Sequence, residues 1–63
     1  MNIPERTAPN FGKALREARE SKGWSIADLS KVSYVGPSQL ARIEAGRRPT
    51  ETAWNNISKA LAD

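Results

Sequence analysis

Three arginines near the middle of the chain carry the side chains best suited to binding another molecule: Arg42 and the adjacent pair Arg47 and Arg48. A guanidinium is planar and always charged, and its fork of N–H donors matches a phosphate or the major-groove edge of guanine. At helical spacing, the short residues Ser38 and Ala45 share the side of Arg42. This flat side with one long cation predicts insertion into a groove, with Arg42 reaching its floor.

Catalytic and metal chemistry find little support in the residue types. The 63 residues include no Cys and no His, which removes disulfides, the usual zinc sites and the His-activated nucleophiles. There is no Gly-rich phosphate loop, and no carboxylate pair that the fold would bring together in a pocket. The sequence therefore predicts a protein that is not an enzyme and uses no metal or cofactor.

The charge distribution favours a polyanionic partner. The net charge is only +3, from ten Lys and Arg against seven Asp and Glu. However, Arg42, Arg47 and Arg48 cluster, while the acids gather near expected helix starts or within the first helix. A basic face of this kind is typical of proteins that bind a phosphate backbone.

No membrane or export signal is visible. No apolar run approaches the ~20 residues needed to span a bilayer. Residues 1–10 are polar and contain two prolines, unlike a signal peptide. We therefore expect a cytoplasmic protein with no membrane partner, located in the bacterial cytoplasm or nucleoid.

The arginines must be positioned by a short helix over residues 37–45. Gly36 is a tolerated N-cap, Pro37 is favoured at the first helical position, and Gly46 suits the left-handed residue after a helix. At about 100° per residue, Leu40 and Ile43 point inward. Outward lie Ser38, Arg42 and Ala45, with Gln39 and Ala41 on the flanks.

A second short helix comes before it. Ser25 and Asp28 form a capping-box-like pair at its start. Leu29 and Val32 give it a weak apolar stripe, and Val35 in the corner over 33–36 is the expected inward plug. Two helices joined by three or four residues, with the second turned outward, indicate a helix-turn-helix.

Two longer helices are expected on either side. One runs from about Asn10, its predicted N-cap, to Lys22, and the other from Thr50 or Glu51 to Ala62. Both carry inward apolar stripes, and Trp24 is expected in the core. The stripes are Phe11, Leu15 and Ala18 in the first, and Trp54, Ile57 and Leu61 in the second.

Residues 1–9 are expected to be a flexible, extended arm before the domain over 10–63. Pro4 and Pro9 break helices, and no apolar period is visible. Arg6 reaching DNA and a simply disordered terminus are both open. The predicted fold class is thus all-α, a compact bundle of four helices, or four to five.

From Phe11 to Leu61, about four-fifths of its length, the chain resembles the phage-repressor and Cro-like helix-turn-helix family, often called the XRE family. Several features recur in order: L-R-x-x-R-x-x-K-G, L-x-R-I-E-x-G, R-x-P-T and I-x-K-A-L. The resembling segments are FGKALREARESKGWS, IADLSKVSYVGPSQLARIEAGRRPT and WNNISKALA.

An ion pair between Arg19 and Glu44 is predicted on two grounds. Arg19 lies beside Leu15 on the apolar side of its helix, where an unpaired charge would be costly, and Glu44 stands on the shoulder of the inward face of 37–45. The resemblance implies the same pair, in a structural role. Two independent solvated charges are the alternative.

Two residues depart from the family pattern. Ile26 stands where Gln commonly meets a phosphate, which leaves that contact to Ser25 and the backbone N–H groups at the helix start. Tyr34 stands where Gly is common. It would be strained by about 1 kcal/mol at positive φ, or the turn would be reshaped; its hydroxyl could reach a phosphate, or its ring could pack over the corner.

The predicted function is sequence-specific binding of double-stranded DNA by a transcription regulator of the phage or bacterial repressor type. Many family members pair through a fifth helix that is absent here, so a homodimer on a palindromic operator, a monomer and a part of a longer protein stay open. The alternative is a protein-interaction module, antitoxin-like or a repressor antagonist. The expected base contacts are Pro37, Ser38 and Arg42, and the expected phosphate contacts are Ser25, Gln39, Arg47 and Arg48.

Overall fold

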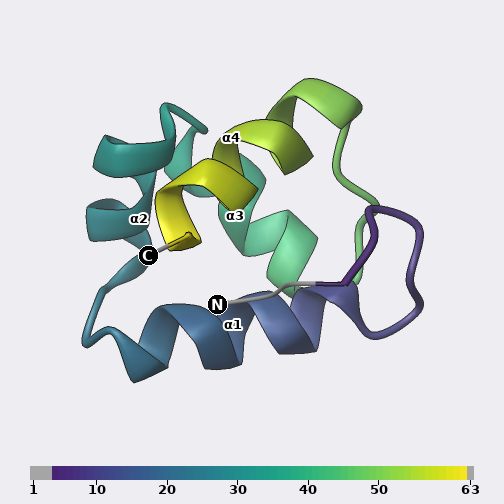
Figure 1. The fold of residues 1–63 in the computed structure, drawn as a ribbon, viewed down its shortest axis with the longest axis horizontal. Helices are drawn as coiled ribbons and strands as arrows, with labels where there is room; N and C mark the ends of the chain where they lie inside the picture. Colours follow the sequence, from purple (N-terminus) through teal and green to yellow (C-terminus); the bar gives the residue numbers. More distant parts are fainter. Residues whose placement is uncertain (1–3, 63) are drawn as a thin grey trace.

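This computed structural model describes residues 4–62. They contain four helices. Figure 1 shows them in order: α1 (Phe11–Ser21), α2 (Ile26–Ser33), α3 (Pro37–Glu44) and α4 (Glu51–Leu61). α1 runs along one side, and the other three gather above it. The described residues include no strand, which confirms the predicted all-α class with four helices.

Side-chain capping hydrogen bonds mark two of the four helix starts, those of α2 and α4. At α2 the Asp28 N–H donates to Ser25 Oγ (3.1 Å), and the Ser25 N–H donates to Asp28 Oδ2 (3.0 Å). At α4 the Thr50 hydroxyl accepts from the Ala53 N–H. Both caps were predicted, whereas the predicted Asn10 cap is wrong in one respect. Its side chain makes no capping hydrogen bond, and its backbone (φ −99°, ψ 17°) lacks the extended conformation typical of a capping residue.

The core is apolar and lies where all four helices meet. Each helix contributes buried apolar side chains to it. Burial of these side chains is the main source of stability in a chain that has no disulfide. The buried apolar residues are Phe11, Leu15, Ala18, Leu29, Val35, Leu40, Ile43, Ala53, Ile57 and Leu61.

Three hydrophobic residues lie further out than predicted. Val32 is 47% exposed, because Leu29 and Ser33 supply the inward face of α2 and Val35 fills the space past its end. Trp24 and Trp54 are only half-buried against the core. The Trp54 indole N–H donates to Pro4 O (3.1 Å), and this need for an acceptor keeps the ring at the edge of the core.

The corner between α2 and α3 contains the one described non-glycine residue at positive φ. Tyr34 has φ 59° and ψ 24°, and its N–H closes the end of α2 on Ser30 O. The turn is therefore not reshaped, and the expected strain of about 1 kcal/mol is retained. The side chain is 90% exposed, so of the two alternatives the packing of its ring over the corner does not occur.

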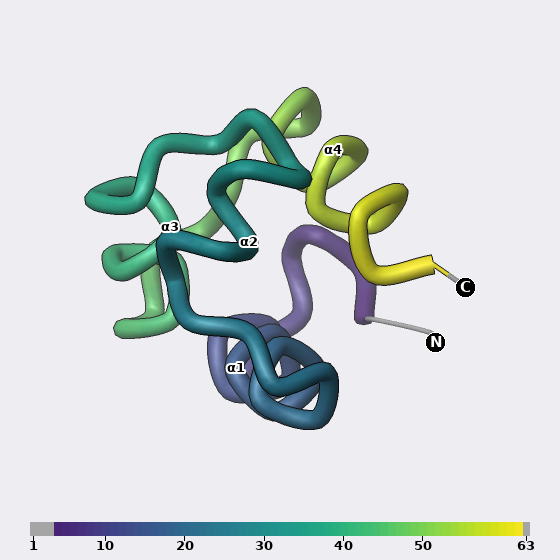
Figure 2. The backbone as a smooth tube through the Cα atoms, turned by 90° about the vertical axis from the view of Figure 1, so that its left-hand side faces the viewer, coloured from purple at the N-terminus to yellow at the C-terminus, as the bar shows by residue number. Residues whose placement is uncertain are grey.

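Residues 4–9 differ from the extended arm predicted for 1–9. They fold back between α1 and α4 (Figure 2), with Ala8 against the core. Arg6 Nη1 donates to Pro49 O (3.2 Å), and Pro4 O accepts from Trp54. The segment thus holds the loop after α3 in place. The first three residues of the predicted arm lie outside the described residues.

We expect Asp28→Asn to remove part of the pH dependence of folding. Hydrogen bonds from the Ser25 backbone and side chain hold the Asp28 pKa below its ordinary value of 3.8. A lowered pKa adds stability that is complete above about pH 5 and is lost as the pH falls through and below about 4. Urea unfolding at a series of pH values should show wild type and Asp28→Asn diverging at neutral pH and converging in acid. Parallel curves would contradict this.

Candidate nucleic-acid interface

The outward side of α3 is open to solvent along its whole length. Leu40 and Ile43 are 0% and 1% exposed and fix the helix to the body. α3 lies at one side of the molecule, with the C-terminal half of α4 at the opposite side (Figure 2). Exposed on α3 are Pro37, Ser38, Gln39, Ala41 and Arg42, followed by Ala45 just past its end.

A buried ion pair sets how α3 sits on α1. Arg19 Nε lies 2.8 Å from Glu44 Oε2, and Nη2 lies 3.0 Å from Oε1, so both arms of the guanidinium fork are used. Arg19 Nη1 also donates to Trp24 O (2.8 Å). The two side chains are only 10% and 8% exposed. The residues predicted as partners thus lie in contact, and they tie α1, α3 and the loop before α2 together.

The same contacts keep Arg19 charged. Hydrogen bonding to Glu44, helped by the charges of Glu44 and Glu20, raises the pKa of Arg19 above its ordinary value despite the burial. The stability that this raised pKa contributes is present at every pH below the ordinary pKa of arginine. The pair is therefore a permanent structural clamp and leaves no pH switch on the arginine side.

One flank of α3 is a basic groove of about 450 Å³, which we call the arginine groove. It runs between α3 and the loop leading to α4. Among residues 4–62, none of its three arginines is held by a carboxylate, so their donors are available to a ligand. The lining residues are Gly36, Ser38, Gln39, Arg42, Ile43, Arg47, Arg48, Pro49 and Thr50.

The other flank of α3 faces α1 across a second hollow of about 320 Å³, the α1–α3 depression. Among the residues that α3 contributes to it, Ala41 and Ala45 have small side chains. It is lined by Arg16, Arg19, Ile26, Ala41, Glu44 and Ala45. α3 therefore stands as a ridge between two hollows.

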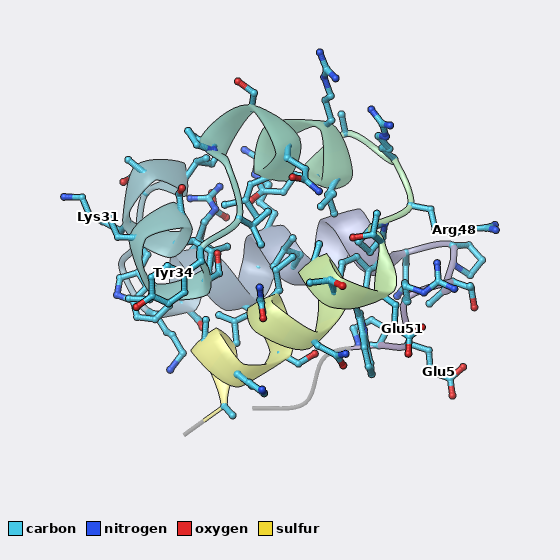
Figure 3. All side chains as sticks on the ribbon, turned by 90° about the horizontal axis from the view of Figure 1, so that it is seen from above. Glu5, Lys31, Tyr34, Arg48 and Glu51 are labelled. Atoms are coloured by element: carbon cyan, nitrogen blue, oxygen red, sulfur yellow. The ribbon has the colours of Figure 1, made fainter. Side chains whose placement is uncertain are left out.

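The structure brings together five of the seven predicted contact residues. Ser38, Gln39 and Arg42 share the arginine groove with the predicted phosphate clamps Arg47 and Arg48. Pro37 is exposed at the adjoining first turn. Figure 3 shows Arg48 pointing outward at one edge of the molecule, with Lys31 and Tyr34 at the opposite edge.

Ser25 is the predicted contact residue that lies apart from the arginine groove. Its N–H and its hydroxyl oxygen are both engaged with Asp28 in the capping box. Ile26 beside it is half-buried and packs against the core. The start of α2 is therefore a weaker anion-binding site than the sequence predicted.

Sequence reasoning missed Gly12, which lets α1 approach the end of α3. A Cβ built on Gly12 would lie 2.4 Å from Ile43 O and 2.9 Å from Glu44 O, both backbone atoms. The available signal was a glycine inside a predicted helix, where it costs about 1 kcal/mol relative to Ala and needs a packing reason.

Neither a metal site nor a membrane span is found in the part of the chain that the structure describes. Residues 4–62 hold no group of three or more His, Cys, Asp or Glu side chains suited to a metal ion. None of the four helices there is long and apolar enough to cross a bilayer.

Comparison with known proteins gives a family and a few distant relatives. The helix-turn-helix family model matches residues 15–62. Uncharacterized HTH-type transcriptional regulators of Mycobacterium bovis and of two strains of Mycobacterium tuberculosis are each 35% identical over 51 residues. The match covers 79% of this chain and 20% of each relative, so the chain spans about a fifth of their length. No solved structure gives a significant match.

Proposed function

The chain belongs to the helix-turn-helix family, and on this premise we propose that it is a transcription regulator that binds duplex DNA with α3 in the major groove. The observation that carries the proposal is the exposed side of α3 around Ser38 and Arg42, held rigidly by Leu40 and Ile43. A helix presented in this way fits the dimensions of the major groove. The names of the mycobacterial relatives agree with such a role.

The contacts divide into those that read bases and those that hold the backbone. Arg42 would form a bidentate pair with guanine, next to Ser38 and the apolar ring of Pro37. Arg47, Arg48 and Gln39 would bind phosphates along the arginine groove, with a weaker contribution from the Ser25 hydroxyl. A protein with this role needs no catalytic group or cofactor, and we expect it to act in the bacterial cytoplasm or nucleoid.

Selection from a random duplex pool tests the proposal and identifies the site. A shared sequence among the recovered duplexes supports it, and a palindromic winner would also support a homodimer on a two-fold operator. No binding at low salt would overturn it and favour a protein-interaction module of the same fold.

Arg42→Ala and Arg47→Ala should weaken binding in different ways. We expect Arg42→Ala to cost about 1–3 kcal/mol on the selected site and to relax preference at one base pair. Arg47→Ala should weaken all sequences alike and lower the slope of log affinity against log salt by about one unit. Fluorescence anisotropy with the selected duplex and single-base variants separates the two. An Arg42→Ala protein that keeps both affinity and preference would contradict the base contact.

A further inference from the structure

α3 is a ridge with a hollow on each side, and a duplex would meet both. The major groove is about 12 Å wide, and a helix with its side chains is about 10–12 Å across, so a helix in the groove has a phosphate backbone close on either flank. One backbone would face the arginine groove. The other would then face the α1–α3 depression, on the side of Ala41 and Ala45.

Two arginines line the α1–α3 depression, and only one is held in place. The donors of Arg19 are already used, since Nε and Nη2 bond to the Glu44 carboxylate and Nη1 donates to Trp24 O. Arg16 is 64% exposed, and its one ion pair is a long contact of 3.4 Å with the exposed Glu20 one turn away. Such i,i+4 surface pairs contribute only about 0.3–0.5 kcal/mol, so Arg16 can leave Glu20 for a stronger anion.

The start of α2 competes poorly for a phosphate on this flank. It lies beside α3 on the same side of the molecule (Figure 2). However, the Ser25 N–H is already bonded to the Asp28 carboxylate, and that exposed negative charge repels a phosphate. The low pKa of Asp28 keeps the charge in place at neutral pH. A cation is therefore needed to hold the backbone here.

We infer that Arg16 binds a DNA phosphate on the flank of α3 opposite to Arg47 and Arg48. The inference rests on the proposed function and adds a residue from α1 to the interface. Arg16 and the arginine pair would then grip the two backbones that border the groove, and α3 would be centred between them.

The test compares Arg16→Gln with Lys59→Gln, which removes the same charge from an exposed site in the last turn of α4. Anisotropy titrations of a mixed-sequence duplex over a salt series give the slope for each protein. Arg16→Gln should lower the slope by about one unit and weaken binding about five- to tenfold near 0.1 M salt. Lys59→Gln should match wild type, and Arg16→Lys should keep the wild-type slope.

The inference is overturned if Arg16→Gln keeps the wild-type affinity and slope, or if Lys59→Gln loses as much. Arg47→Ala separates this failure from that of the proposed function. A slope that falls in Arg47→Ala but not in Arg16→Gln would contradict only the Arg16 contact. A wild-type protein that binds no duplex would contradict both the Arg16 contact and the proposed function. Circular dichroism of each variant confirms that the helices are intact.

Discussion

Replacing Arg19 with Met while Glu44 stays in place is expected to lower the free energy of unfolding by about 3–5 kcal/mol. The variant leaves the Glu44 carboxylate at a site where it is 8% exposed and has lost both arms of its partner. It also leaves Trp24 O without its donor. A domain of this length is expected to have only about 3–9 kcal/mol of stability, so a large fraction of the variant should be unfolded at 37 °C.

Urea unfolding followed by circular dichroism measures the effect, and two controls define its cause. Arg19→Met combined with Glu44→Leu should recover most of the loss, because an apolar pair of similar volume often replaces a buried ion pair at little cost. Arg16→Met removes the same charge from an exposed pair and should change the free energy by less than about 0.5–1 kcal/mol. Equal losses in Arg16→Met and Arg19→Met would show that burial of the pair is not the cause.

Gly12→Ala should be the other large single change, although it usually favours a helix. Ala stabilises a helix by about 1 kcal/mol relative to Gly. Here the added Cβ would overlap Ile43 O and Glu44 O, which are backbone atoms and cannot rotate away. Relief requires α1 and α3 to separate, which also pulls at the Arg19–Glu44 pair. We expect a net loss of about 2–3 kcal/mol, as in overpacked cores.

Thermal unfolding tests this, and Gly36→Ala is the matched control. A loss of that size lowers Tm by about 10–20 °C in a domain this small. A Cβ on Gly36 meets no atom within 4 Å, and its φ is an ordinary −58°, so the same substitution there should change Tm by only a few degrees. A Gly12→Ala protein as stable as wild type would mean that α1 and α3 are not in the close contact described.

Most of the fold could be predicted because its signals are local. Ser25 with Asp28, and Thr50, mark helix starts through hydrogen bonds within one turn of the chain. Pro37 marks the start of α3 through its fixed φ. The apolar period identified Leu40 and Ile43, and so fixed which side of α3 faces outward. The family prediction is confirmed by the match over residues 15–62.

The features that were missed depend on contacts between distant parts of the chain. Arg6 bonds to a carbonyl 43 residues away, and Trp54 to one 50 residues away, so neither bond leaves a pattern in a short window. The need for Gly12 follows from how closely two helices cross, which no periodicity encodes. Val32 was misplaced because α2 already ends at Ser33, and Val35 in the corner takes the inward position. The individual base and phosphate contacts stay predictions.

The left-handed backbone conformation of Tyr34 affects which residues can replace it in the corner. Glycine would remove the strain of about 1 kcal/mol, but it would also give the unfolded chain extra conformational freedom worth about 0.5–1 kcal/mol. The two effects nearly offset each other. Selection on stability alone would thus act weakly at this position, and a bulky side chain can persist there without a partner of its own. Asparagine, which tolerates the left-handed region and has less backbone freedom than glycine, is the replacement that should raise the melting temperature most.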